Sequence, residues 1–246
     1  MYDIIGDIHS CYIEFTMLLE KLGYVFEGEV YKHPQGRKII SVGDIMDRGD
    51  YPVATFTLIK HMTESGDMLS VRGNHCEKIW KWAKGGGVKL SHGADKTARD
   101  FESISYPKED IITFFDKVPF YRLLDDGKLA IVHASWKDRN IETDPFDYKR
   151  LKGDCLYGPT TGQRDAWDLP IRIDWAAQRV LTKNSPFVVY GHQMHREPYL
   201  KNHSVDIDTG CAFGGKLTAL RYPEIQFVDV KALRAYAQWK GEEGDD

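Results

Sequence analysis

Short apolar runs alternate with amphipathic segments through the first third of the chain. Three apolar runs of strand length lie at residues 2–5, 38–42 and 68–72. Each run is followed by a segment whose apolar residues recur every three or four positions, at residues 11–22, 52–65 and 76–83. That spacing places the apolar side chains on one face of a helix. The pattern therefore predicts alternating strands and helices, which is typical of an α/β fold.

The second half of the chain is richer in predicted strands. Residues 84–117 are expected to be mainly helical, with a break at the three consecutive glycines 85–87. Apolar runs at 120–124 and 129–133 flank Asp125-Asp126-Gly127, which is a strong hairpin signal. Further strands are predicted at residues 187–190, 203–208, 217–221 and 225–230. Because no linker-like composition separates the halves, we predict one domain over residues 1–240 and a disordered acidic tail at 241–246.

Composition and charge narrow the classes of function. The chain has 246 residues, of which 42% are hydrophobic and 28% charged, as expected of a globular protein. A formal net charge of −4 gives no electrostatic footprint for extended nucleic acid or an anionic membrane, but it allows a small phosphate-bearing ligand. No apolar run approaches the roughly 18 residues that span a bilayer. Because the chain opens without a signal segment and its four cysteines lie far apart, we expect a cytoplasmic protein with reduced thiols.

Acidic residues and histidines follow the predicted strands in a fixed order. The first three strands are followed by the motifs Gly6-Asp7-Ile8-His9, Gly43-Asp44-Ile45-Met46-Asp47-Arg48-Gly49 and Gly73-Asn74-His75. Two later strands are followed in the same way by His133 and His192. Residues beyond the carboxyl ends of the strands gather at one edge of an open α/β sheet. Asp7 and His9 are two residues apart, so on an extended segment both side chains point to the same side.

These side chains form a mixed oxygen and nitrogen ligand set without thiolate. The set consists of Asp7, His9, Asp44, Asn74, His133 and His192. Such a set suits Mn²⁺, Fe or Zn²⁺ better than Cu(I) or an iron–sulfur cluster. Six groups are too many for one tetrahedral ion but sufficient for two ions that share Asp44. Two ions about 3.5–4 Å apart fit phosphoryl hydrolysis, because they clamp the attacking and leaving oxygens.

The same motifs supply candidates for the remaining catalytic roles. Arg48 follows Asp44 by four residues, and the planar fork of arginine matches phosphate oxygens. His75, next to the candidate ligand Asn74, is placed to protonate the leaving oxygen, and Asp47 is placed to orient His75. The sequence therefore predicts a complete metal-dependent phosphohydrolase site.

The motifs GDIH, GDIMDRG, RGNH, VHAS and YGHQ resemble those of calcineurin-like metallophosphoesterases, specifically the phosphoprotein phosphatase branch. Within that branch, RGNHC, LYG at 156–158, PIRIDWA at 170–176 and DTGCAFG at 208–214 resemble bacterial PrpE-type enzymes, over roughly residues 1–225. The resemblance implies a four-layer αββα sandwich with two central mixed β-sheets. It also implies two divalent transition-metal ions, with Mn²⁺ first and Fe, Zn²⁺, Ni²⁺ or Co²⁺ as alternatives.

The resemblance also distributes the candidate residues over specific roles. It implies that Asp7, His9 and bridging Asp44 hold the first ion, and that Asp44, Asn74, His133 and His192 hold the second. Arg48 matches the phosphate-binding arginine of the family, His75 its general acid, and Asp47 the partner of that acid.

Three further residues have two interpretations each. Arg172 in the PIRIDWA segment best matches a second phosphate-binding arginine, with a surface ion pair as the alternative. Asp208 either orients a metal-bound histidine or caps a turn. Trp80 lies between lysines on its predicted helix, so it either stacks on a substrate base or packs under the neighbouring helical segment.

The resemblance favours a hydrolase of dinucleoside polyphosphates such as diadenosine tetraphosphate. A Ser/Thr phosphoprotein phosphatase is the main alternative, so the expected partner is a small phosphorylated substrate, either a nucleotide or a phosphopeptide. An RNA-end phosphatase or phosphodiesterase and a non-catalytic phosphate-binding module rank lower.

Overall fold

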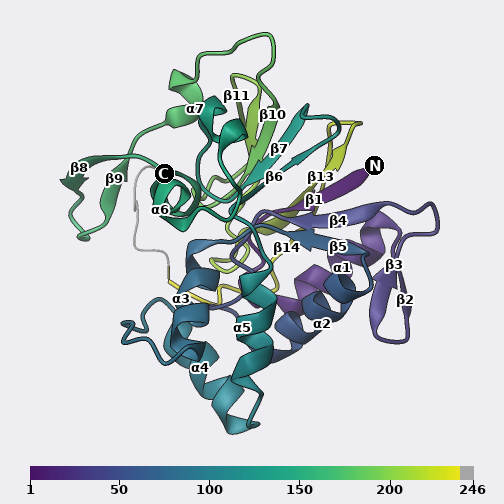
Figure 1. The fold of residues 1–246 in the computed structure, drawn as a ribbon. Helices are drawn as coiled ribbons and strands as arrows, with labels where there is room; N and C mark the ends of the chain where they lie inside the picture. Colours follow the sequence, from purple (N-terminus) through teal and green to yellow (C-terminus); the bar gives the residue numbers. More distant parts are fainter. Residues whose placement is uncertain (239–246) are drawn as a thin grey trace.

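Two five-stranded sheets form the centre of the computed structural model, which describes residues 1–238. The strands of the first sheet are β1 (Tyr2–Ile5), β4 (Lys38–Ser41), β5 (Met68–Ser70), β13 (Lys216–Tyr222) and β14 (Gln226–Lys231). Those of the second are β6 (Tyr121–Leu124), β7 (Leu129–Val132), β10 (Phe187–Tyr190), β11 (Tyr199–Lys201) and β12 (Ser204–Asp206). The strand orders are β14-β13-β1-β4-β5 and β11-β12-β10-β7-β6 (Figure 1).

Both sheets are mixed, with three parallel strands each. In the first sheet β1, β4 and β5 are parallel, and β13 and β14 add antiparallel pairs beside β1. In the second sheet β7, β10 and β12 are parallel, and β6 and β11 are antiparallel strands at its two edges. The six predicted metal ligands therefore follow the carboxyl ends of five parallel strands, namely β1, β4, β5, β7 and β10.

Helices cover the outer face of each sheet (Figure 1). The first sheet is covered by α1 (Tyr12–Leu22), α2 (Pro52–Glu64), α3 (Asn74–Ala83), α4 (Ala94–Ser103) and α5 (Lys108–Asp116). The second is covered by α6 (Tyr148–Leu151), the π-helical η2 (Lys152–Tyr157) and α7 (Trp175–Gln178), near the 3₁₀ turn η1 (Asp138–Glu142). Two small hairpins complete the fold: β2 (Val25–Glu27) with β3 (Val30–Lys32), and β8 (Thr160–Arg164) with β9 (Pro170–Arg172).

The alternation of side chains along each strand assigns them to different layers. In β1, Ile4 belongs to the hydrophobic cluster between the sheets, whereas its neighbour Ile5 belongs to the cluster under the helices. In β7, Ile131 faces the first sheet and Val132 faces the helical layer on the other side. Successive residues of a strand point to opposite faces, so a continuous apolar run fills two interfaces at once. The predicted four-layer αββα sandwich is confirmed.

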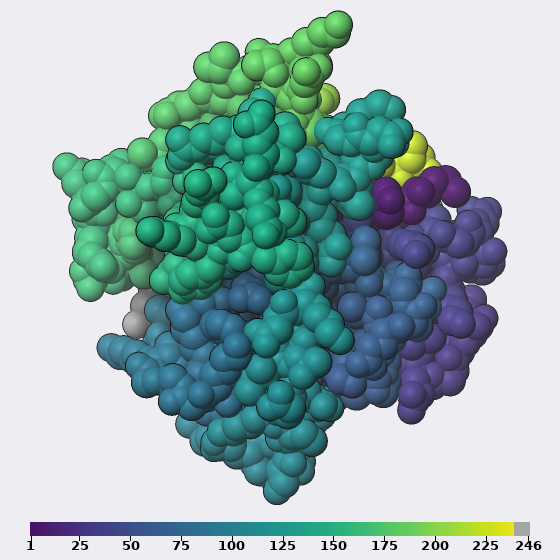
Figure 2. All heavy atoms as spheres, in the orientation of Figure 1, coloured from purple at the N-terminus to yellow at the C-terminus, as the bar shows by residue number. Residues whose placement is uncertain are grey.

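Several local predictions differ from the structure. The hairpins β2–β3 and β8–β9 and the strand β11 were not predicted, and β8–β9 stands out from the side of the molecule (Figures 1 and 2). Helix α3 begins at Asn74 rather than at residue 76, so Asn74 and His75 lie in its first turn. His9 has a φ of 46° and begins a turn, so the segment from Asp7 to His9 is not one continuous extended strand.

Two predictions concern the end of the chain and its division into domains. The acidic tail at 241–246 lies beyond the described part of the chain, and the single-domain interpretation stays a prediction. Within residues 1–238, no helix is long and apolar enough to cross a membrane.

Candidate functional site

The loops at the carboxyl ends of the parallel strands from both sheets bring the six predicted ligands together. We call these residues the ligand cluster: Asp7, His9, Asp44, Asn74, His133 and His192. Asp7 and His9 follow β1, Asp44 follows β4, and Asn74 follows β5. Asp44 Oδ2 lies 3.8 Å from His9 Nε2 on one side and 3.4 Å from His133 Nε2 on the other. This position between two imidazoles is the one required of a bridging ligand.

Hydrogen bonding fixes which nitrogen of His9 faces the cluster. His9 Nδ1 lies 2.9 Å from the carbonyl oxygen of Met46, which can only accept, so Nδ1 carries the proton. The lone pair is therefore on Nε2, which lies 4.0 Å from Asp7 Oδ2 and 3.8 Å from Asp44 Oδ2. The other oxygen, Asp7 Oδ1, is buried and has no hydrogen-bond partner among the described residues. The unprotonated Nε2 of His9 thus faces one oxygen of Asp7 and one oxygen of Asp44.

The same logic applies to His133. Its Nδ1 donates to the carbonyl oxygen of Val42 at 3.1 Å, which leaves the lone pair on Nε2. That nitrogen lies 2.9 Å from Asn74 Oδ1, 3.4 Å from Asp44 Oδ2 and 3.1 Å from His192 Nδ1. Facing lone pairs at such distances repel one another unless a cation lies between them. The cluster therefore has the donor chemistry of two cation sites that share Asp44.

The protonation states agree with this interpretation. Burial lowers the pKa of His9 to about 3 and that of His192 well below its ordinary value, so both imidazoles are neutral, the form that binds metal. Burial, followed by the charges of Asp208 and Asp44, raises the pKa of Asp7 well above its ordinary value. A bound dication would compensate this concentration of carboxylates.

Two glycines allow the ligands to approach the backbone. A Cβ on Gly191 would lie 2.1 Å from Asp7 Oδ1, and a Cβ on Gly73 would lie 2.1 Å from Asp44 Oδ1. Real Cβ atoms essentially never approach another atom below 3.0 Å. These glycines are therefore required by the carboxylates packed against them, and Gly73 and Gly191 immediately precede the predicted ligands Asn74 and His192.

Backbone strain is concentrated at the site. Five site residues that are not glycine have left-handed φ values between 40° and 76°: His9, Asp44, Asp47, Arg48 and His192. Each such conformation costs of order 1 kcal/mol or more, and it persists only where the surrounding structure imposes it. These conformations therefore lower the stability of the fold, and they bring the five side chains toward one another.

His75 lies between Asp47 and Arg48. Its Nδ1 is 2.7 Å from Asp47 Oδ2, and its Nε2 is 3.3 Å from Arg48 Nη2. Its backbone N–H donates to Asp44 Oδ1 at 2.8 Å, which ties the imidazole to the ligand cluster. Burial lowers the pKa of His75 to about 3 and raises the pKa of Asp47 to about 7. Both shifts disfavour an ion pair here in the absence of substrate.

Arg172 is the last residue of β9, in the separate β8–β9 hairpin. Its guanidinium donates to the carbonyl oxygen of Tyr157, and burial lowers its pKa. The pKa of His192 is lowered first by burial, then by His133 and by the charge of Arg172. Arg172 is therefore near enough to His192 to act on the site electrostatically, and it has no acidic partner among the described residues. This placement fits the phosphate interpretation better than the surface ion pair.

Trp80 and Asp208 lie in surroundings that favour their structural alternatives. Trp80 packs against the helical core, its indole N–H donates to Asp116 Oδ1 at 2.8 Å, and two cations, Arg72 and Lys84, lie 5.0 and 4.1 Å from its ring. An indole covered in this way has little face left for a base. Asp208 Oδ1 accepts from Gly210 N at 3.0 Å, which is a turn cap, although its charge lies near Asp7. The predicted roles of both residues stay untested.

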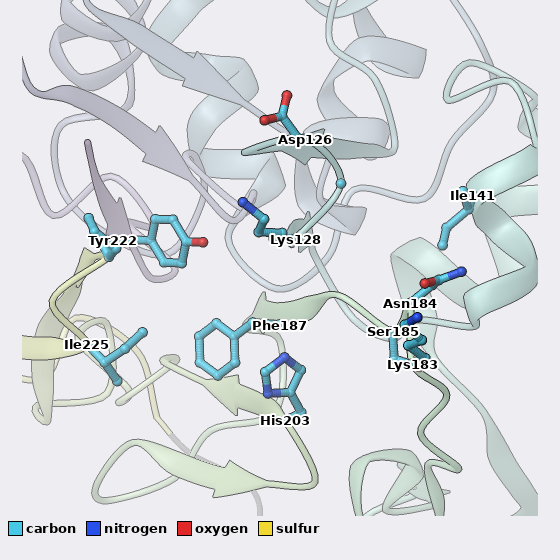
Figure 3. Close-up of a pocket in the computed structure, with 12 residues that line it drawn as sticks. Asp126, Lys128, Ile141, Lys183, Asn184, Ser185, Phe187, His203, Tyr222 and Ile225 are labelled. Atoms are coloured by element: carbon cyan, nitrogen blue, oxygen red, sulfur yellow. The ribbon is translucent and has the colours of Figure 1, made fainter.

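A large cavity lies away from this cluster. Its volume is about 790 Å³, and its walls include Lys128, Phe187, His203 and Tyr222, which are drawn in Figure 3. Lys128 and His203 precede β7 and β12, and Phe187 begins β10, whereas the predicted ligands follow the other ends of these strands. The cavity and the ligand cluster are therefore at opposite ends of the second sheet.

One contact of the site had no signal in the sequence. The ring of Phe213 lies under the Arg48 guanidinium, with Cζ 4.7 Å from the ring centroid. The two residues are far apart in the chain, so local periodicity cannot connect them. Only the tertiary structure reveals the pair.

Comparisons with known proteins agree with the geometry. The model of the calcineurin-like phosphoesterase family matches residues 2–228. The asymmetrical bis(5'-nucleosyl)-tetraphosphatases PrpE of Anoxybacillus flavithermus and Bacillus subtilis are each 38% identical to the chain, over 98% and 96% of both sequences respectively. A solved structure described as a candidate diadenosine tetraphosphatase has a TM-score of 0.65 at 20% identity and covers 98% of this chain and 94% of its own.

A second solved structure shows the same fold at lower identity. It is a protein serine/threonine phosphatase from Saccharomyces cerevisiae, with a TM-score of 0.59 at 12% identity, covering 94% of this chain and 79% of its own. The sequence motifs, the two-sheet sandwich and the family match lead to the same conclusion. The chain belongs to the calcineurin-like phosphoesterase family.

Proposed function

We propose that this chain hydrolyses dinucleoside polyphosphates, with diadenosine tetraphosphate as the first candidate, by means of two divalent metal ions. The observation that carries the metal part is the convergence of the His9 and His133 lone pairs on Asp44 from two sides. The substrate is supported by the relatives named asymmetrical bis(5'-nucleosyl)-tetraphosphatase, which match nearly the whole chain.

In this proposal the ligand cluster holds both ions. Asp7, His9 and Asp44 hold one, and the other is held by Asp44, Asn74, His133 and His192. The unpartnered Asp7 Oδ1 and His192 Nε2, both buried, fit a site built for a group other than protein. The donor set contains no thiolate and suits Mn²⁺, Fe or Zn²⁺, with Ni²⁺ and Co²⁺ as further candidates. Bound there, the ions supply water of lowered pKa and compensate the charge of the phosphate.

The other residues bind the phosphate chain and move one proton. Arg48 binds the phosphoryl group under attack, and Arg172 binds a phosphate further along the chain. His75 donates a proton from Nε2 to the leaving oxygen, while Asp47 accepts the hydrogen bond from Nδ1 and fixes the ring. Phosphate brings negative charge beside His75 and takes over the N–H groups of Arg48, and both changes favour the protonated imidazole.

The leaving group sets how much this proton matters. Cleavage of a phosphoanhydride releases a phosphate oxygen, whose second pKa is about 6, so it departs without much help. Cleavage of a phosphoserine releases an alkoxide, which needs the acid. If the best substrate is cleaved almost as fast without His75 as with it, that substrate is therefore a phosphoanhydride.

Product analysis tests the proposal directly. The Mn²⁺-loaded protein is incubated with diadenosine tetraphosphate, a phosphoserine peptide or a 2',3'-cyclic nucleotide, and the products are separated by chromatography. Asymmetrical hydrolysis of the dinucleotide gives ATP and AMP, and Asp44→Ala is the inactive control. Cleavage of the peptide without cleavage of the dinucleotide would replace this proposal with the protein-phosphatase alternative. If none of the three substrates is cleaved, the alternative of a non-catalytic phosphate-binding module replaces the proposal.

A further inference from the structure

Burial lowers the pKa of Arg48 and the charges of nearby carboxylates, Asp44 first, oppose this, but no carboxylate of the described residues lies within ion-pair distance of its guanidinium. Its Nη2 lies 3.3 Å from His75 Nε2, and its Nε is buried without a hydrogen-bond partner among the described residues. A cation held in this way has free donors for an incoming anion, but its long side chain needs some other restraint to stay in place.

The ring of Phe213 is placed to supply that restraint. The Arg48 Cζ lies 4.7 Å from the ring centroid, within the range of a cation–π interaction. An aromatic face attracts the guanidinium without accepting its N–H groups and without neutralising its charge. A carboxylate in the same place would occupy the fork and compete with phosphate for it.

Phe213 is itself held by backbone contacts on both sides. Its N–H donates to Gly210 O at 2.9 Å, and it forms an antiparallel bridge with Ala235. The N–H groups of Tyr236 and Ala237 both donate to the carbonyl of Ala212, at 2.8 and 2.9 Å. Residues 232–237, which we call the C-terminal segment, therefore run alongside the loop that carries Phe213.

The C-terminal segment is anchored to the first half of the chain as well. The buried Glu14 in α1 accepts Leu233 N–H at 2.9 Å and the Tyr236 hydroxyl at 2.7 Å through the same oxygen. Arg234 forms an ion pair with Asp50, two residues beyond Arg48. The loop of Arg48 and the loop of Phe213 are thus tied to one shared segment.

We propose that Phe213 is a positioning residue for Arg48, which holds the guanidinium over its ring and ready for a phosphate. The inference rests on the proposed function only through the phosphate-binding role of Arg48. Removing the aromatic face while keeping the bulk, as in Phe213→Leu, leaves Arg48 free to adopt other rotamers. Phosphate then has to order the side chain on binding, which weakens the affinity.

The test is a double-mutant cycle on phosphate binding. Calorimetry measures the affinity of the Mn²⁺-loaded protein for inorganic phosphate in the parent, Phe213→Leu, Arg48→Ala and double variants. Phe213→Leu is expected to weaken binding about five- to tenfold in the parent, which is the size of a partly desolvated cation–π interaction. It is expected to change nothing in the Arg48→Ala background. An equal loss in both backgrounds shows that Phe213 does not act through Arg48 and overturns the proposal.

Further variants separate positioning from a merely structural role. Phe213→Tyr keeps the ring and is expected to bind phosphate as the parent does, whereas Phe26→Leu, on the exposed β2–β3 hairpin, is the matched control for loss of a phenyl ring. If Phe213→Leu binds phosphate as tightly as Phe213→Tyr, the proposal is wrong. If Phe213→Leu raises KM for the dinucleotide but leaves phosphate binding unchanged, the ring contacts a base instead, and the proposal is again wrong. Because phosphate binding needs no turnover, failure to cleave dinucleotides does not affect this test.

Discussion

Gly191→Ala should remove a metal ligand without changing any ligand residue. A Cβ at this position would lie 2.1 Å from Asp7 Oδ1, whereas ordinary contact begins at 3.4 Å, so the oxygen has to move by about 1.3 Å. Metal–ligand distances tolerate only about 0.2 Å. The φ of Gly191 is not left-handed, so alanine itself introduces no backbone strain.

The clash should be relieved by the side chain of Asp7 and not by unfolding. The nearest atoms to the new methyl group belong to the side chains of Asp7 and Val42, the latter at 2.9 Å, and no backbone atom is among them. Overpacking of this kind costs about 1–3 kcal/mol of stability, which a folded domain tolerates. A displaced catalytic group of this size lowers turnover on the order of 10²-fold.

Metal analysis and turnover together measure the effect. We expect Gly191→Ala to retain the second ion, to lose the first at low Mn²⁺ concentration, and to recover part of its p-nitrophenyl phosphate hydrolysis when Mn²⁺ is added in excess. Gly87→Ala is the matched control, because its Cβ meets no atom within 4 Å. Two bound ions and parent turnover in Gly191→Ala would refute the placement of Asp7 in the site.

Three other predictions concern the general acid, the indole of α3 and two buried thiols. His75→Ala should keep both ions and lose turnover most for alkyl phosphates, less for p-nitrophenyl phosphate and least for diadenosine tetraphosphate; equal losses would remove His75 as the acid. Trp80→Phe removes the hydrogen bond to Asp116 and should lower the free energy of unfolding by about 1 kcal/mol. KM for the dinucleotide should not change, and a tenfold higher KM would support the base-stacking role instead. Burial raises the pKa of Cys76 and Cys155 above the ordinary thiol value, so these thiols stay neutral at pH 8 and should react with Ellman's reagent only after denaturation.

The ligand cluster could be predicted because each of its residues has a recognisable place in the sequence. Each candidate residue follows an apolar run of strand length, and the parallel strands of a sheet bring such ends together. The backbone conformation at His9 could not be predicted in this way. His9 Nε2 comes within 4.0 Å of Asp7 Oδ2 because His9 has a positive φ, a conformation that side-chain periodicity does not encode.

Other features depend on contacts that no local pattern contains. The helical spacing predicts that Trp80 points away from the core-facing side of α3, whereas in the structure it packs against the core, with Arg72, Lys84 and Asp116 around it. The hairpin β8–β9 is exposed along the whole of its first strand, so it lacks the alternation by which a strand is recognised. The pairing of Phe213 with Arg48 joins distant parts of the chain and has no periodic signature at all.

The position of β1 also determines when the site can form during biosynthesis. β1 pairs with β4, which follows soon after it, but its other neighbour is β13, with Ile5 opposite Ala219. Until residues 216–222 have left the ribosome, β1 is an edge strand with unpaired backbone groups, exposed to wrong partners. Closing so long a loop is also slow. Asp7 follows the end of this strand, so a nascent chain that already contains all six predicted ligands still lacks the strand that pairs with β1 on its other side.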